Sequence, residues 1–222
     1  MRSTMESLGP CILEGKFVRL EPLRREHAPG IHEAAKSTDW EWFLGPLRTR
    51  KDVDRRVADG IAAERRGEAY AFAVRMLGDG RILGSTSYMT VVSTHKRAEI
   101  GSTWYSKDVW GTAVNPECKF LLLRHAFEEW GAVRIQLGTD SRNVHSQGAI
   151  LKLGAKFEGT LRNHGIRQDG SARDTKLYSI VDVEWPEVKA NLLSRIQSFG
   201  GGLPESIPKR GRGSDGPQRS PI

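Results

Sequence analysis

The chain has 222 residues, enough for one well-packed core, so we expect a single domain with terminal appendages. The net charge is +7, but lysine and arginine are scattered among aspartate and glutamate, so the charge does not indicate nucleic-acid binding. The two cysteines form no metal-ligand spacing, no apolar run reaches the roughly 20 residues that span a bilayer, and the N-terminus lacks a signal-peptide core. The composition therefore predicts a cytoplasmic protein without a metal or a membrane anchor.

The first part of the chain predicts a strand, two helices and a hairpin. Apolar and polar residues alternate in the first run, and Pro22 near its end suits a strand at a sheet edge. Thr49 or Asp52 is a suitable cap for the second helix, and Gly78-Asp79-Gly80 is a strong hairpin signal. The predicted elements are a strand at 17–23, helices at 26–37 and 50–66, and strands at 69–76 and 82–92.

An aromatic loop lies between the two helices. It contains Trp40, Trp42 and Phe43, and such a cluster is more often part of a core than of a ligand site. Aromatic side chains are also common pocket walls. The three residues are therefore candidates for acceptor binding, with the core as the alternative.

The central stretch predicts a strand, a helix and a second strand that is parallel to the first. Strands are expected at 98–105 and 133–137, and the crossover between them requires a parallel βαβ unit. Asn115 is a good N-cap and Pro116 suits the first helical position, so the helix is predicted to begin at Asn115. The turn before it, residues 110–114, is built largely of small residues, so its amides and the helix dipole could hold a pyrophosphate.

The last part predicts a short helix, two strands and a closing helix. The helix at 143–153 ends at Gly154, a common residue after a helix terminus. The other predicted elements are strands at 155–162 and 173–183, joined by a loop with Asp169-Gly170, and a helix at 188–196. We expect residues 1–12 to be a flexible lead, 13–197 to be the domain, and the Gly-, Pro- and Arg-rich residues 198–222 to be disordered.

This order of elements resembles the GNAT acyltransferase fold, a mixed α/β fold with a predominantly antiparallel sheet and a central parallel pair. The segments GKFVRLEPL, EIG, WGTAVNPECKFLLLRHAFEEWGAVRIQLGTDSRN and SQGAILKLGAKFEGTLRNHGIRQDGSARDTKLYSIVDVEWPEVK look like the branch with ribosomal-protein N-terminal acetyltransferases. The resemblance covers residues 13–196. It implies acetyl-CoA as cosubstrate and a primary amine that attacks the thioester directly.

The family's pyrophosphate loop has Arg or Gln, two residues, Gly, one residue, and then Gly or Ala. Here those places hold Trp110, Ala113 and Asn115, and Ala113 allows close approach of a phosphate if its φ is negative. The resemblance implies phosphate binding by the amides of four residues, with Lys119 as a charge partner or, alternatively, as a solvated surface lysine. The four residues are Thr112, Ala113, Val114 and Asn115.

The resemblance also implies roles for residues of the next helix. Asn143 is a natural N-cap, and in related enzymes the asparagine here also bonds the pantetheine arm of the cofactor. Many relatives carry a tyrosine that protonates the leaving thiolate, but Ile150 occupies that place here. Ser146 is the nearest replacement, and the alternative is that it is only a tolerated polar residue.

Glu99 is the candidate base. It precedes Ile100 in its strand, so it lies on the opposite face and could take a proton from the acceptor ammonium. The alternative is a surface glutamate paired with Arg97 or a lysine. Of the histidines, His125 is expected to be structural, while His145 and His164 are expected near the acceptor.

The sequence predicts an acetyl-CoA-dependent N-acetyltransferase whose acceptor is a protein N-terminus or a small-molecule amine. A non-catalytic acyl-CoA-binding module is the competing interpretation, because Ala113 departs from the usual glycine and the tyrosine is missing. A basic ribosome-associated protein is a third, weaker interpretation, and a homodimer is a possible assembly.

Overall fold

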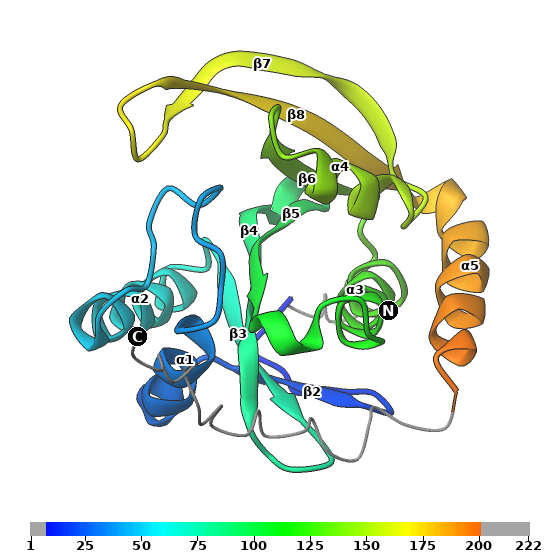
Figure 1. The fold of residues 1–222 in the computed structure, drawn as a ribbon. Coiled ribbons are helices and arrows are strands. Elements are labelled where there is room, and N and C mark those ends of the chain that lie inside the picture. Colours follow the sequence, from blue (N-terminus) through cyan, green and yellow to red (C-terminus); the bar gives the residue numbers. More distant parts are fainter. Residues whose placement is uncertain (1–7, 201–222) are drawn as a thin grey trace, which may run out of the picture.

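An eight-stranded mixed sheet carries helices on both of its faces in the computed structural model, which describes residues 8–200 (Figure 1). The strands are β1 Leu13–Glu14, β2 Val18–Pro22, β3 Tyr70–Met76, β4 Ile82–Val92, β5 Arg97–Tyr105, β6 Arg134–Asp140, β7 Lys156–Ile166 and β8 Ala172–Val181. The helices are α1 Ala28–Ala35, α2 Arg50–Arg65, α3 Val114–Arg124, α4 Val144–Leu151 and α5 Trp185–Ser198. The strand order is β1-β2-β3-β4-β5-β6-β8-β7, so the predicted order of elements and the mixed α/β fold are confirmed.

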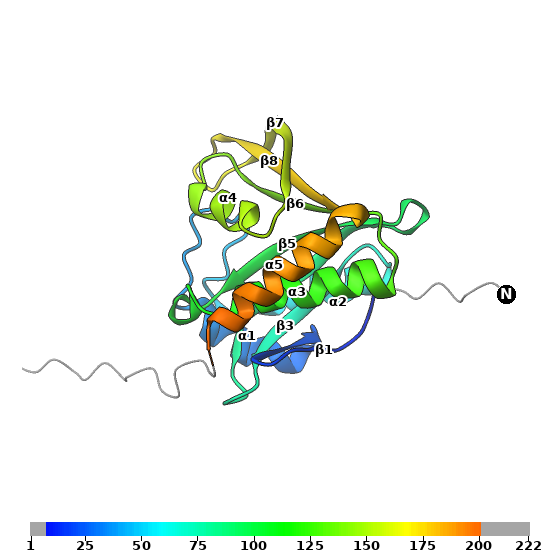
Figure 2. The same cartoon turned by 90° about the vertical axis from the view of Figure 1, so that its right-hand side faces the viewer.

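The helices form two layers around the sheet. Helices α1 and α2 cover one face, and α3 and α5 cover the other, where they run side by side (Figures 1 and 2). Each layer has its own buried cluster of apolar side chains. The strands β6, β8 and β7 bend away from the rest of the sheet and arch over one end of the molecule (Figure 1).

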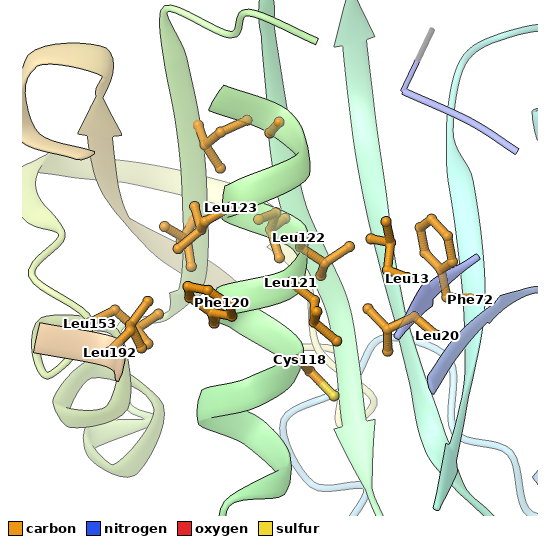
Figure 3. Close-up of a cluster of buried hydrophobic side chains, with 14 of the residues drawn as sticks. Leu13, Leu20, Phe72, Cys118, Phe120, Leu121, Leu122, Leu123, Leu153 and Leu192 are labelled. Atoms are coloured by element: carbon orange, nitrogen blue, oxygen red, sulfur yellow. The ribbon is translucent and has the colours of Figure 1, made fainter. Parts of the chain in front are cut away.

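Helix α3 is buried almost all round, as expected for a helix between a sheet and another helix. Leu121 and Leu122 are no more than 1% exposed, and Cys118 is fully buried. Figure 3 shows the helix with Leu153 and Leu192 on one side and side chains of the sheet on the other. A helix packed on both sides has little freedom to shift, so its first residue has a fixed position.

The cap of α2 is formed as the sequence predicts. Thr49 Oγ1 accepts a hydrogen bond from the Asp52 amide at 3.2 Å, and the Asp52 carboxylate accepts one from the Thr49 amide at 2.9 Å. These two bonds form a capping box, in which each residue satisfies a backbone donor of the other.

The position of one strand and the start of one helix differ from the prediction, and the bounds of the other elements differ from it by at most four residues. Strand β2, which contains Pro22, lies between β1 and β3 and is not the edge strand, because the two-residue β1 pairs with its outer side. Helix α3 begins at Val114 and not at Asn115, because Thr112 Oγ1 accepts a hydrogen bond from the Val114 amide at 3.3 Å and Ala113 already has helical φ and ψ. Pro116 remains inside the first turn, where its missing N–H costs nothing.

The predicted ends of the domain are also too short. Leu8 is 1% exposed and belongs to the main core, so the part of the expected lead from Leu8 onward is packed. Helix α5 continues through Ser198, and Phe199 packs against the same core. The rest of the expected lead and tail, residues 1–7 and 201–222, lies outside the described residues.

A buried carboxylate joins α3 to the beginning of the sheet. Glu117 is 3% exposed, and its two oxygens accept hydrogen bonds from the backbone amides of Lys16, Phe17 and Val18 at 2.7, 2.8 and 2.9 Å. A Cβ on Gly15 would lie 2.4 Å from the Glu117 carboxyl carbon, so this turn needs glycine. The carboxylate therefore fixes the turn between β1 and β2 on the side of α3.

We expect Glu117→Gln to lower the free energy of unfolding by about 2 to 4 kcal/mol, because the new amide group points two donors at buried amides that need an acceptor. Urea unfolding followed by circular dichroism measures the change. Glu41→Gln, at an exposed loop position, is the matched control and should leave the midpoint unchanged. Equal midpoints for the two variants would contradict the role of Glu117.

Candidate active site

The two parallel strands separate after their first three residues. The β5–β6 ladder pairs Arg97 with Arg134, Ala98 with Ile135, and Glu99 with Gln136, and then ends. Beyond that point β5 continues along β4 and β6 continues along β8. The facing edges of β5 and β6 are thus left without a ladder, and an extended ligand could lie there as an added strand.

The loop before α3 offers unpaired amides. Within residues 8–200, the amides of Thr112, Ala113 and Asn115 have no hydrogen-bond acceptor, whereas that of Val114 is bonded to Thr112 Oγ1. Gly111 makes the turn with φ of +75°, and Ala113 has φ of −64°, so alanine is unstrained there as the sequence analysis required. Three of the four predicted amides are therefore available to an anion, close to the positive end of the α3 dipole.

Lys119 does not lie free on the surface. It is 6% exposed, and its Nζ donates a hydrogen bond to Thr103 Oγ1 on β5 at 2.8 Å. The Thr103 oxygen lies 2.7 Å from Thr86 Oγ1 on β4. The surface-lysine alternative is wrong, and the ammonium is directed at the sheet. Because no carboxylate lies within ion-pair distance in the described part of the chain, burial lowers the pKa of Lys119 to about 8.

Glu99 lies half-buried on the face of β5 opposite Ile100, as its position in the strand predicts. Its Oε2 accepts a hydrogen bond from Gln136 Nε2 at 3.1 Å, so the alternative of pairing with Arg97 is wrong. A Cβ on Gly101 or Gly138 would lie 3.2 or 3.5 Å from Glu99 Oε1. The two glycines keep side chains away from this carboxylate.

The surroundings of Glu99 favour its neutral form. Burial raises the pKa of Glu99, and the hydrogen bond from Gln136 and the charges of His164 and Arg173 offset this only in part. A carboxylate with a raised pKa is a stronger base than one in water, which suits proton transfer from an amine.

The three predicted histidines have different surroundings. His164 lies close enough to Glu99 for a charge on its ring to lower the pKa of that carboxyl, and its Nδ1 is 3.2 Å from Thr175 Oγ1. His145 does not join it, because its ring stacks on Trp110 of the α3 loop with centroids 5.9 Å apart. His125 is 3% exposed beside Tyr88, so its structural role is confirmed.

Asn143 caps α4, as the sequence predicts. Its Oδ1 accepts a hydrogen bond from the Ser146 amide at 2.9 Å. Ser146 is half-buried in the first turn, and its hydroxyl has no hydrogen-bond partner within residues 8–200. Ile150 is 7% exposed and faces the core, so it can take no part in proton transfer.

One side chain of the aromatic loop is buried in the core, and two are partly exposed. Trp40 is 9% exposed, donates from Nε1 to the Ala35 carbonyl at 3.1 Å, and packs on Trp104 with ring centroids 5.0 Å apart. The core alternative therefore applies to Trp40. Trp42 and Phe43 are half-buried, and of the three predicted aromatic residues only these two have partly exposed side chains.

The β7–β8 hairpin closes over this loop. Gln168 at its tip donates hydrogen bonds from Nε2 to the carbonyls of Trp40 and Phe43 at 2.6 and 2.7 Å (Figure 1). Arg167 bonds both oxygens of Asp140, at 2.8 and 2.9 Å, and thereby fixes the hairpin to the end of β6. The sequence marked this segment only as a loop, because the carbonyl groups that Gln168 bonds lie more than 100 residues away.

A cavity of about 210 Å³ lies between α2 and the sheet, on the same face as Glu99. Trp104, Met89, Ser102 and Arg56 are among the side chains that line it. Neither this cavity nor the role of Arg56 could be recognised in the sequence, because an arginine on an amphipathic helix normally faces solvent.

Across residues 8–200 no three histidine, cysteine or acidic side chains come together as metal ligands. No helix in this range has the length and apolar character of a membrane span.

The family model described as "Acetyltransferase (GNAT) domain" matches residues 18–156. YoaA of Bacillus subtilis (strain 168), an uncharacterized N-acetyltransferase, is 30% identical over 100 residues, which are 45% of this chain and 55% of YoaA. The chain thus spans little more than half the length of the curated relatives it matches.

Solved structures agree with this match. A GCN5-related N-acetyltransferase from Brucella melitensis is 26% identical, with a TM-score of 0.77 over 91% of this chain and 90% of that one. RimJ of Mycobacterium smegmatis, solved with CoA-disulfide, is 20% identical, with a TM-score of 0.72 over 86% and 97% of the two chains. The expected resemblance to the GNAT acyltransferases is confirmed by the family model, to whose family the chain belongs.

We expect the contribution of Lys119 to the free energy of unfolding to rise with pH above 8. Its pKa is lower in the folded than in the unfolded state, so between pH 8 and 10 the unfolded chain binds the extra proton and folding gains free energy. Relative to Lys119→Met, wild-type protein should gain about 2 kcal/mol over this range, since one pKa unit corresponds to about 1.4 kcal/mol.

Urea unfolding at pH 7, 8, 9 and 10 measures this difference. Burial raises the pKa of the neighbouring Cys118 thiol to about 12, so this thiol lowers the stability as the pH rises through the same range. Because wild type and Lys119→Met share Cys118, its contribution cancels in the difference between them. Lys51→Met, at an exposed position on α2, is the control, and its free energy of unfolding should change with pH as that of the wild type does. A pH-independent difference between wild type and Lys119→Met would contradict the lowered pKa.

Proposed function

Because the chain belongs to the GNAT acetyltransferase family, we propose that it transfers an acetyl group from acetyl-CoA to a primary amine, by direct attack of the amine within a ternary complex. The acceptor is a protein N-terminus or a small-molecule amine. The observation that carries this proposal is the position of Glu99, a half-buried carboxylate with a raised pKa at the point where β5 and β6 separate.

The residues around this point suit a bound CoA. The unpaired amides of Thr112, Ala113 and Asn115 would hold the pyrophosphate, and the side-chain amide of Asn143 would bond the pantetheine arm. Val114 and Lys119 would not contact the cofactor directly. The Val114 amide is already bonded to Thr112 Oγ1, and the Lys119 ammonium is already bonded to Thr103 Oγ1. Acetyl-CoA, when bound, supplies the acetyl thioester.

In the proposed reaction, Glu99 accepts a proton from the acceptor ammonium, directly or through water. The free amine forms the new C–N bond at the acetyl carbon as the C–S bond breaks. The Ser146 hydroxyl then gives its proton to the sulfur that leaves, and it regains one, directly or through water, from the nitrogen, which loses this second proton to become a neutral amide. Positioning of the amine beside the thioester supplies most of the rate, and half-buried Trp42 and Phe43 would form part of the acceptor's surroundings.

Release of free CoA with a panel of peptides and small amines tests the proposal, and Glu99→Gln tests the base. The base acts only when ionised, so wild-type kcat/KM should fall as the pH drops through the raised pKa of Glu99. Glu99→Gln should lose this limb and lower turnover more at neutral than at alkaline pH, where more of the acceptor is already deprotonated.

Glu187→Gln, at an exposed position on α5 across the sheet, should keep the wild-type pH profile. A uniform loss across pH in Glu99→Gln would assign Glu99 to binding or structure. Wild-type protein that binds acetyl-CoA but releases no CoA with any amine would favour the non-catalytic acyl-CoA-binding module, for which the buried Ile150 is the supporting feature.

Two substitutions on α4 should separate binding from chemistry. We expect Ser146→Ala to lower kcat about ten- to hundredfold through loss of the proton donor, with unchanged acetyl-CoA affinity. We expect Asn143→Ala to weaken acetyl-CoA binding and to cost about 1 kcal/mol of stability through the lost cap. Isothermal titration and steady-state kinetics distinguish the two results. Full turnover in Ser146→Ala would mean that the thiolate leaves without this donor.

A further inference from the structure

Arg56 places a half-buried positive charge in the cavity between α2 and the sheet. Its guanidinium donates from Nη1 to Ser102 Oγ at 3.2 Å and from Nη2 to the Gly45 carbonyl at 3.1 Å. Both partners are neutral, and in the described chain no carboxylate lies within the 4.0 Å of an ion pair with Arg56. Only two of the five N–H donors of the guanidinium are occupied by these bonds.

The charges near Arg56 do not neutralise it. Asp59 lies one turn further on α2 and also lines the cavity, but it is exposed, so water screens its charge. Arg55 is exposed and pairs with Asp52 at 3.0 Å. Burial lowers the pKa of Arg56, and the Asp59 charge only partly opposes this. A desolvated cation without a counter-charge gains strongly from an anion that fits beside it.

Ser102 of β5, which has a strained backbone, places its hydroxyl in the cavity beside Arg56. β4 pairs Ser87 with Gly101 and Ser85 with Trp104, so Ser102 and Thr103 of β5 both face Thr86 and form a bulge. Ser102 has φ of +50°, a left-handed conformation that costs a serine about 1 to 2 kcal/mol.

The bulge changes which face of the sheet Ser102 occupies. In a regular strand, residues three apart point to opposite faces, so Ser102 would lie away from Glu99. The extra residue brings Ser102 onto the Glu99 face, where it meets Arg56, while Thr103 meets Lys119 on the other face. Strain that places a polar side chain in a cavity is typical of a ligand site.

The cavity also reaches towards the candidate base. Met89 lines the cavity, and its sulfur lies 2.9 Å from the point where a Gly101 Cβ would be, which is itself 3.2 Å from Glu99 Oε1. Glu99 and Ser102 are three residues apart along β5, which corresponds to roughly 10 Å. One ligand can therefore contact both ends.

From this arrangement we propose that Arg56 and Ser102 bind a carboxylate of the acceptor, so that the preferred substrate is an amine with a carboxylate roughly 10 Å away. A peptide with a free N-terminus and Asp or Glu as its second residue has this shape. Paired N–H donors of a guanidinium match the two oxygens of a carboxylate, and the apolar cavity wall suits the side-chain stem. This inference rests on the proposed amine acetylation and names its substrate class.

The test compares two amidated tripeptides, Ala-Glu-Ala and Ala-Gln-Ala, in CoA-release kinetics. With wild-type protein we expect kcat/KM for the acidic peptide to be at least tenfold higher. Arg56→Gln should abolish that preference by lowering only the value for the acidic peptide, and Arg56→Lys should retain part of it. Arg55→Gln, at the neighbouring exposed position, is the matched control and should keep the full preference.

Titration of the same peptides onto wild-type protein saturated with CoA measures binding without turnover. This comparison of the two peptides does not need the Arg56→Gln variant, so it remains valid if that variant folds poorly. 6-Aminohexanoate and its amide repeat the comparison with a small amine, and a preference for the acid in either pair supports the inference. Equal kcat/KM and Kd within both pairs, in wild-type protein, would overturn it and leave amine acetylation intact. Arg56-dependent binding of the acid without any CoA release would instead overturn the proposed reaction alone.

Discussion

The bonds between the Glu117 carboxylate and three backbone amides determine where the rest of the structure can lie. They join the turn before β2 to the first turns of α3, two parts of the chain about 100 residues apart in sequence. Helix α3 is also packed between the sheet and α5, so the position of its first residue relative to β5 is fixed. The unpaired amides before α3 and the separation of β5 from β6 are thereby brought to one end of the sheet.

The bulge in β5 gives the two faces of this end different chemistry. Thr103 contacts the buried Lys119 on the α3 face, and Ser102 contacts Arg56 on the α2 face. Both cations lack an ion-pair partner among residues 8–200, which is unusual for a protein interior. The strain at Ser102 and the burial of two charges reduce stability, so this end of the sheet is shaped for purposes other than stability.

Much of the fold could be predicted from the sequence because its elements have regular periods and clear caps. The helix at 50–66 had its capping box, and the hairpin had its Gly-Asp-Gly turn. The errors came from contacts distant in sequence or from very short elements. β1 has too few residues to show alternation, and the Thr112 hydroxyl moved the start of α3.

The residues of the candidate site could likewise be predicted where neighbouring residues determine their position, and not where distant contacts do. Glu99 could be placed because strand alternation fixes its face, and Asn143 because a cap depends on neighbouring residues. Lys119, His145 and Arg56 could not be placed, because a polar residue on a helix shows its true partner only after the helix has packed. The aromatic loop was ambiguous for the same reason, and packing assigned Trp40 to the core.

The contact between the hairpin and the aromatic loop has a consequence for evolution. Gln168 bonds the main-chain carbonyls of Trp40 and Phe43, so closure of this contact does not depend on which side chains the loop carries. Substitutions at half-buried or exposed loop positions such as Trp42 or Leu44 leave these two hydrogen bonds intact. The side chains of the loop can therefore change while its backbone stays in place, which would let the proposed acceptor site take new amines through few mutations.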